Sequence, residues 1–190
     1  NRTWSAGTAG GMFDVQSLPV KHAHVNLGAP GYREESGRLW VPYSGRRSIG
    51  TGVIGKWLPT YKHNASMFYA RSGDLLEISG TRLQWLYTSG YQHSKPLMFT
   101  LLDRGDKPAK YTVRLHFAEP EDLKAGQRIF SVFIQNKLAL KDFDIVAAAG
   151  GIRKAIIKEF KGVEVTGGLK INMSSTKVKP LLCAFEAIRE

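Results

Sequence analysis

The residues best suited to bind a ligand gather around one predicted turn. Tyr87 and Tyr91 flank a Thr-Ser-Gly stretch, and Gln92 and His93 follow directly. Sugar rings have apolar C–H faces that stack on aromatic side chains, while their hydroxyl groups bond to polar side chains. Trp57 adds a further ring from a second aromatic stretch. These five side chains predict a carbohydrate-binding site, and the alternative is that the rings are core residues between two sheets.

Two groups of acidic residues could support a different chemistry. Glu119, Glu121 and Asp122 form the first group, and Asp142 and Asp144 form the second. A glycosidase needs two carboxyl groups about 5–9 Å apart across a cleft, which proximity in sequence does not establish. The second group suits the capping of a turn, and calcium binding is the alternative. We expect capping, no catalytic residue and no cofactor.

The remaining motifs argue against several classes of site. The glycines lack the spacing of a phosphate-binding loop, and no Gly-x-Ser-x-Gly nucleophile elbow occurs. His22 and His24 share one strand face, but no third metal ligand is near them in sequence. Cys183 is the single cysteine and stands in an apolar run, which indicates a buried thiol. We expect neither a metal site nor nucleophilic catalysis.

Size and charge restrict the class of protein further. The chain has 190 residues and is 43% hydrophobic, enough for one core. Its formal net charge of +11 favours anionic partners. Most of the basic residues stand singly among acids, without the interleaved aromatics of a nucleic-acid interface. No run approaches the roughly 20 apolar residues that span a bilayer, so we expect no membrane insertion.

Short runs of β-branched and aromatic residues between turn residues predict an all-β protein. In residues 111–117, apolar side chains alternate with polar ones, so one face packs on a core. Asn136 should take a positive φ in a tight hairpin after residues 129–134. The predicted strands are residues 22–27, 66–70, 83–88, 96–102, 111–118, 128–135, 155–160, 168–174 and 180–189. This number of strands favours a two-sheet antiparallel β-sandwich with a jelly-roll-like topology.

The chain divides into a lead-in and one domain. Residues 1–21 are rich in glycine and lack a strand pattern, so we interpret them as a linker from a preceding domain. Residues 22–190 form the predicted β-sandwich. Within it, residues 43–62 are loop-like.

The middle of the chain carries a resemblance to a known family. The runs YTVRLHFAE at 111–119, QRIFSVFIQN at 127–136 and KDFDI at 141–145 resemble malectin and malectin-like domains in order and spacing. The resemblance spans about residues 22–189 and is weaker at both ends. Residues 26–43 also resemble bacterial malectin-like domains of large exported proteins.

This resemblance implies a jelly-roll-like sandwich, no catalysis, and binding of glucose-containing oligosaccharides through loop aromatics. Tyr91 matches a sugar-contacting tyrosine of the family. Pro120 and Glu121 stand where malectin has a sugar-contacting aromatic pair, and residues 174–179 replace its ligand-binding acid. The resemblance therefore implies the family's fold with a different ligand, for which the basic charge favours an anionic polysaccharide.

These observations predict a non-catalytic carbohydrate-binding module that is secreted, periplasmic or at the cell surface and tethered to other domains of the same precursor. The alternative is a structural or protein-interaction sandwich that has lost the sugar site. Three Asn-x-Ser/Thr sequons begin at Asn1, Asn64 and Asn172. They are glycosylation acceptors in a eukaryotic secretory route and stay bare after bacterial export.

Overall fold

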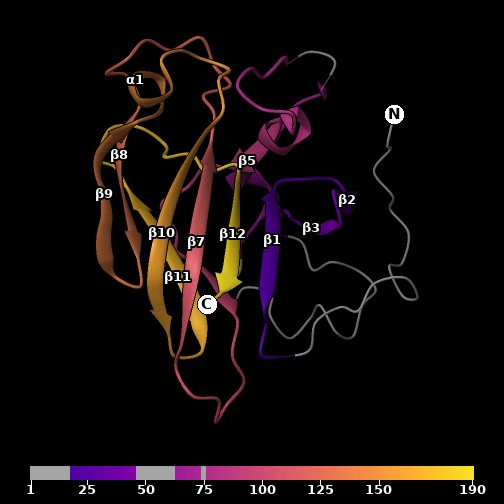
Figure 1. Cartoon of the computed structure of the whole chain (residues 1–190). Helices are drawn as coiled ribbons and strands as arrows, with labels where there is room; N and C mark the ends of the chain where they lie inside the picture. Colours follow the sequence, from indigo (N-terminus) through magenta and orange to yellow (C-terminus); the bar gives the residue numbers. More distant parts are fainter. Residues whose placement is uncertain (1–17, 46–62, 74–75) are drawn as a thin grey trace.

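The protein is a β-sandwich of two main sheets. The structure, a computed structural model, describes residues 18–45, 63–73 and 76–190. A six-stranded and a four-stranded sheet face each other, and a two-stranded ribbon lies at one end of them (Figure 1). All pairings between strands are antiparallel except that of β1 with β3. The predicted all-β sandwich is confirmed.

Each sheet combines strands that are far apart in sequence. The six-stranded sheet has the order β10 (Ile156–Val165), β7 (Ala109–Phe117), β12 (Ala184–Arg189), β1 (His22–Leu27), β3 (Arg38–Tyr43) and β2 (Arg33–Glu35). The four-stranded sheet has the order β6 (Leu97–Thr100), β11 (Gly168–Ser174), β8 (Ile129–Ile134) and β9 (Lys137–Asp144). The ribbon pairs β4 (Phe68–Ala70) with β5 (Ser89–Tyr91). Strand β12 thus lies between β7 and β1, at the centre of its sheet.

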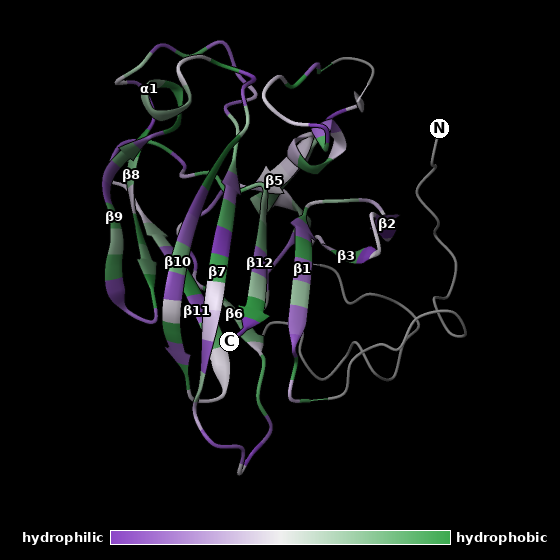
Figure 2. Ribbon diagram, viewed as in Figure 1, coloured by the Kyte–Doolittle hydropathy of each residue, from purple (hydrophilic) through white to green (hydrophobic). Residues whose placement is uncertain are grey.

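The core forms where the inner faces of the two sheets meet. Tyr111, Val113 and Leu115 alternate along β7 with outward residues and have no exposed surface, as their spacing predicts. Figure 2 shows this alternation of apolar and polar residues along β7 and β10. Phe99 of β6 and Phe185 of β12 join the sheets, with ring centroids 4.7 Å apart. Each such buried side chain contributes about 1.5–3 kcal/mol to folding.

The hairpin between β8 and β9 turns on two residues with positive φ. Gln135 has φ 49° and Asn136 has φ 62°. A turn with two left-handed residues matches the twist of the flanking strands. The prediction for Asn136 is confirmed.

The predicted strand at residues 83–88 is wrong. Residues Gln84–Tyr87 form a short 3-10 helix, η4, and its last two residues, Leu86 and Tyr87, are both buried. Successive residues of a strand point to opposite faces, so a strand could not bury both against one layer. The helical turn places both in a second apolar cluster with Trp40 and Cys183. The predicted burial of the Cys183 thiol is confirmed, and this burial raises its pKa to about 11.

Two further elements complete the described chain. Helix α1 (Ile145–Ala149), which the strand pattern did not indicate, follows β9, and η2 (Ala65–Met67) precedes β4.

Val20, in the expected lead-in, is buried: its N–H bonds to Leu101 O, and its carbonyl accepts from the Tyr111 hydroxyl. No helix in the described part of the chain has the length and apolar character needed to cross a membrane.

Candidate ligand-binding groove

The two tyrosines of the predicted aromatic site are buried. Tyr91 has 0% and Tyr87 has 1% of its surface exposed, and they belong to different apolar clusters. The Tyr91 hydroxyl donates to Lys95 O at 2.7 Å, and the Tyr87 hydroxyl lies 3.0 Å from His116 Nδ1. Burial raises the pKa of both phenols. Neither ring presents a face to a sugar in this arrangement.

The other members of the predicted site are distributed differently. His93 is partly exposed, its ring centroid is 6.3 Å from that of Tyr91, and its Nδ1 accepts from the Lys95 N–H. Gln92 is also partly exposed, and its backbone N–H donates to Met67 O. Trp57 lies outside the described residues. The structure thus brings Tyr91, Gln92 and His93 together, and the role of all five residues in ligand binding stays a prediction.

A groove of about 400 Å³ lies at one end of the four-stranded sheet, where β8, β9 and β11 meet the loops beside them. Ile129 contributes an apolar surface that is 41% exposed. The lining residues are Gly126, Gln127, Ile129, Phe130, Ser131, Asp142, Ser174, Ser175, Thr176, Lys177 and Val178. Hydroxyl groups predominate among the polar side chains of this lining. The Ser-Ser-Thr run after a predicted strand was the sequence signal that could have indicated the groove.

One wall of the groove, residues 174–178, is held by a serine. Ser175 Oγ donates to Ile129 O at 3.0 Å and accepts from the Val178 N–H at 3.3 Å. The first bond ties the wall to the start of β8, and the second closes the loop on itself. The exposed side chains of Ser174 and Thr176 on either side are therefore carried on a fixed backbone.

A second part of the lining, formed by Gly126 and Asp142, adjoins the cap of helix α1. Asp144 Oδ1 accepts from the Ala147 N–H at 3.0 Å, and Asp144 Oδ2 accepts from the Gly126 N–H. The predicted capping role of Asp144 is confirmed, while Asp142 instead lines the groove. Asp142 has φ 45°, an uncommon conformation for a residue other than glycine. Its N–H donates to Ser131 Oγ at 3.2 Å, so two lining residues are held together.

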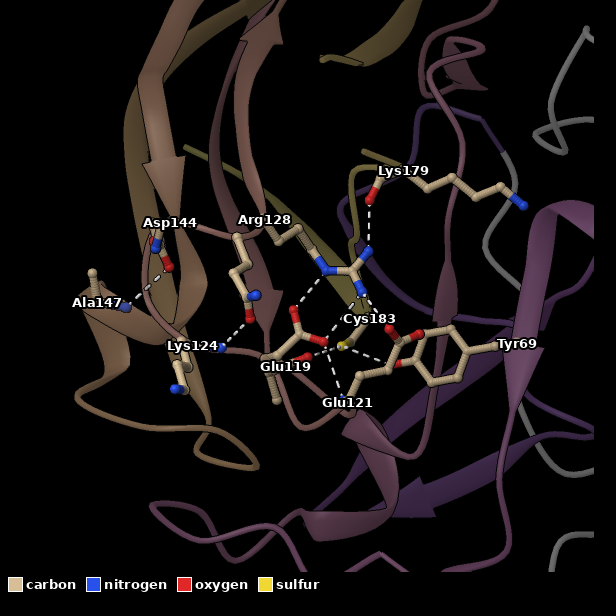
Figure 3. A network of polar contacts seen from close by, with 12 residues as sticks. Tyr69, Glu119, Glu121, Lys124, Arg128, Asp144, Ala147, Lys179 and Cys183 are labelled. Carbon is tan, nitrogen blue, oxygen red and sulfur yellow. Dashed lines mark hydrogen bonds and ion pairs between the residues drawn. The ribbon is translucent and has the colours of Figure 1, made fainter. Parts of the chain in front are cut away.

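An ion pair beside the groove joins the loops behind it (Figure 3). Arg128 Nε lies 2.6 Å from Glu119 Oε2, and both side chains are buried. Arg128 also donates to Lys179 O at 2.7 Å and lies 3.1 Å from Glu121 Oε2. One guanidinium therefore connects the end of β7, the start of β8 and the approach to β12.

This network accounts for the first group of acids. Glu119 and Glu121 bind the same guanidinium, and Asp122 pairs with Arg153 at 2.6 Å. Glu119 has no exposed surface, so its carboxyl group does not face an open cleft as a glycosidase acid must. Within the described segments, no group of three or more His, Cys, Asp or Glu side chains could hold a metal ion.

A second buried carboxylate lies on the outer face of the six-stranded sheet. Glu186 Oε1 accepts from His116 Nε2 at 3.0 Å, and its Oε2 is 3.5 Å from His24 Nε2 and 3.6 Å from the Arg38 guanidinium. Because the carboxylate accepts, His116 Nδ1 is free to accept from the Tyr87 hydroxyl. Burial lowers the pKa of His24 to about 4, although the negative charge of Glu186 alone would raise it. His24 thus pairs with a carboxylate instead of with His22.

The comparisons with known proteins agree with this architecture. A family model described as the malectin domain matches residues 58–189. A probable leucine-rich repeat receptor-like serine/threonine-protein kinase of Arabidopsis thaliana is 31% identical over 170 residues, which cover 86% of this chain and 16% of that protein. The chain therefore spans about one sixth of that relative.

Solved structures show the same fold. The extracellular domain of ANXUR1 from Arabidopsis thaliana superimposes with a TM-score of 0.66 at 16% identity, covering 88% of this chain and 47% of that one. A structure described as plant peptide RALF23 in complex with FER and LLG2 gives a TM-score of 0.63 at 16% identity, covering 88% and 48%. At these identities the likeness concerns the fold alone.

Proposed function

The chain belongs to the malectin family, and from that premise we propose that it is a non-catalytic recognition domain that binds an oligo- or polysaccharide in its groove. The observation that carries this proposal is a groove rich in hydroxyl groups whose lining is held by internal hydrogen bonds. A site that is already ordered loses little conformational entropy when a ligand enters.

The groove has the chemistry that a sugar needs. The hydroxyl groups of Ser131, Ser174 and Thr176 both donate and accept, which suits a ligand whose own groups are hydroxyls. The carboxylate of Asp142 accepts from neighbouring sugar hydroxyls, and charge-assisted bonds of this kind are the stronger ones. Ile129 offers an apolar surface to the C–H face of the ring.

Charge around the groove favours a ligand that carries acidic groups on part of its length. Lys177 lines the groove and is exposed, and the chain as a whole has a formal charge of +11. A lysine ammonium forms charge-assisted bonds with a uronate or sulfate group. The Asp142 carboxylate then accepts hydrogen bonds from the hydroxyl groups of the same ligand.

We place this recognition outside the cell, on a longer protein. The relatives are described as receptor-like kinases, and one structural neighbour is described as an extracellular domain. The chain spans about one sixth of the kinase and about half of the extracellular domain. A tethered binding module at the cell surface is the role that fits such proportions.

Protein recognition is the second candidate function. Its supporting observation is the burial of Tyr87 and Tyr91, because a buried ring cannot stack on a sugar. One structural neighbour is described in complex with a peptide. In this alternative, the sandwich keeps the family fold and contacts a protein instead of a sugar.

The test is a glycan-array and affinity-gel screen of neutral and acidic polysaccharides at low and high salt. Asp142→Asn is the sharpest variant, because asparagine tolerates a positive φ and removes the carboxylate alone. Thr176→Ala removes one lining hydroxyl. We expect both to weaken binding at least tenfold, and Tyr91→Ala, run alongside, tests the aromatic site.

A matched pair of lysines measures the contribution of charge. Lys177→Ala removes the groove cation, and Lys107→Ala removes an exposed lysine beyond the opposite end of β7. Groove binding of an acidic ligand predicts a loss for the first variant alone, together with weaker binding in salt. If the unaltered protein binds no glycan in the screen, the protein-recognition alternative takes its place.

A further inference from the structure

Two Asn-x-Ser sequons in the described part of the chain have opposite surroundings. Asn64-Ala65-Ser66 stands on the surface before strand β4, and Asn172-Met173-Ser174 stands in strand β11. The sequon is the acceptor sequence for N-linked glycosylation of exported proteins. Which of the two carries a glycan therefore depends on the accessibility of the asparagine side chain.

The first sequon is open to a modifying enzyme. Asn64, Ala65 and Ser66 are all exposed. Asn64 has extended backbone angles, φ −111° and ψ 164°, and its carbonyl accepts from the Met67 N–H, which forms a single turn. Ser66 Oγ donates to Asn64 Oδ1 at 2.8 Å, so the two side chains that define the sequon lie on the same side of the chain.

The second sequon is enclosed in the sheet. Strand β11 pairs with β6 on one side and with β8 on the other, and Asn172 lies opposite Phe133 in this ladder. The Asn172 side chain is partly buried, and its Oδ1 atom has neither exposed surface nor a hydrogen-bond partner in the structure. An oligosaccharide on this amide would have to grow from a crowded sheet surface.

We propose that Asn64 carries an N-linked oligosaccharide and that Asn172 does not. The donor is an oligosaccharide attached to a lipid through a diphosphate. A bond forms between Asn64 Nδ2 and the anomeric carbon of the first sugar, while the bond from that carbon to the diphosphate oxygen breaks. The bonding electrons leave on the diphosphate, and the amide proton passes to a base of the transferase.

The glycan at Asn64 covers the ribbon of β4 and β5. Met67, one residue beyond the sequon, accepts the backbone N–H of Gln92, and Phe68 pairs with Tyr91. The sugar chain therefore stands beside the segment of the predicted aromatic site. It is not attached to β8, β9 or β11, which line the groove, so the proposed binding site stays open.

This inference rests on the extracellular location in the proposed function, reached through a eukaryotic secretory route, and is independent of sugar binding in the groove. Its test uses the full-length protein isolated from the cells that make it. Trypsin releases the two sequons in separate peptides, residues 63–71 and 171–177, because each follows a lysine and ends in a basic residue. Peptide N-glycosidase in heavy-oxygen water then converts each glycosylated asparagine to labelled aspartate.

We expect the label at Asn64 and unmodified asparagine at Asn172. Recovery of peptide 63–71 wholly unmodified, or a label at Asn172 instead, overturns the proposal. A pair of variants gives a second readout: Ser66→Ala reduces the enzyme-sensitive shift in gel mobility by the mass of one glycan, whereas Ser66→Thr and Ser174→Ala leave it unchanged. An undiminished shift in Ser66→Ala contradicts the assignment, because the sequon at Asn1 is intact in every variant. Groove binding by Asn64→Gln, measured in parallel, reports separately on the proposed function.

Discussion

Two buried carboxylates in this sandwich are stabilised by different kinds of partner. Glu119, beside the groove, binds the guanidinium of Arg128, which stays charged at every pH that a protein tolerates. Glu186, on the outer face of the six-stranded sheet, is bonded by the imidazole of His116 and approached by that of His24. Burial alone would raise the pKa of Glu186, but these partners outweigh it and the pKa is lowered.

The two pairs therefore differ in whether the partner of the carboxylate changes its charge with pH. Arg128 also binds a backbone carbonyl and so fixes loops that border the groove. His24, beside Glu186, has its pKa lowered to about 4, so its charge changes as the pH falls. The pair beside the groove therefore keeps its cation over the pH range in which His24 takes up a proton.

The largest expected effect is at the permanent pair. Arg128→Met leaves the Glu119 carboxylate buried without its cation, which should lower the free energy of unfolding by about 3–5 kcal/mol. Urea denaturation followed by tryptophan fluorescence measures this loss. The double variant Arg128→Met/Glu119→Gln, which removes both charges, should recover part of it. A loss below about 1 kcal/mol for the single variant would show that the Arg128–Glu119 pair contributes little to stability.

The next largest effect is a dependence of stability on pH. The pKa of His24 is lowered to about 4 in the folded protein, so the unfolded chain binds this proton first as pH falls. Stability is then full above about pH 6.5 and declines toward pH 4, by roughly 3 kcal/mol at most. The lowered pKa of Glu186 extends the decline below pH 4.5.

Two variants sharpen this test. His24→Gln should flatten the decline between pH 6.5 and 4, whereas His22→Gln, at an exposed position of the same strand, should leave it in place. Arg128→Met should lower stability by a similar amount at all of these pH values. An unchanged slope in His24→Gln would show that another group is responsible.

A smaller effect compares the two carboxylates directly. Glu119→Gln weakens two bonds to a guanidinium, and we expect a loss of about 2–3 kcal/mol at pH 7. Glu186→Gln keeps an oxygen that accepts from His116, and we expect a loss of about 1 kcal/mol. Chemical denaturation at pH 7 distinguishes the two. Equal losses would mean that stability does not depend on whether a guanidinium or an imidazole binds the carboxylate.

The smallest effect concerns the exposed partner of Glu186. Arg38 lies 3.6 Å from the carboxylate, but its side chain is 49% exposed. Solvent screens such a pair, so Arg38→Ala should change stability by less than about 1 kcal/mol. Thermal unfolding at low and high salt would check this. A loss as large as that of Glu119→Gln would place Arg38 among the essential partners.

The sequence predicted the features that depend on neighbours along the chain. Alternation identified the buried face of β7, turn chemistry identified Asn136, and capping chemistry identified Asp144. Other features depend on contacts between distant segments. The burial of Tyr91 follows from its bridge with Leu182, which no local pattern shows.

The groove escaped sequence analysis for the same reason. Its lining comes from three separate segments: residues 126–131, Asp142 and residues 174–178. Each segment alone looks like an ordinary strand end or turn. Only the pairing of β8 with both β9 and β11 brings them to one place.

The central position of β12 also sets the order of folding. Residues 184–189 insert between β7 and β1, so the six-stranded sheet cannot close before they leave the ribosome. Strand β3 pairs with one edge of β1 soon after β1 is made, but the other edge of β1 pairs with residues more than 150 positions later in the chain. Contacts of such long range slow folding and leave strand edges exposed in the meantime. During synthesis, one edge of β1 and one edge of β7 therefore stay unpaired until β12 has been made.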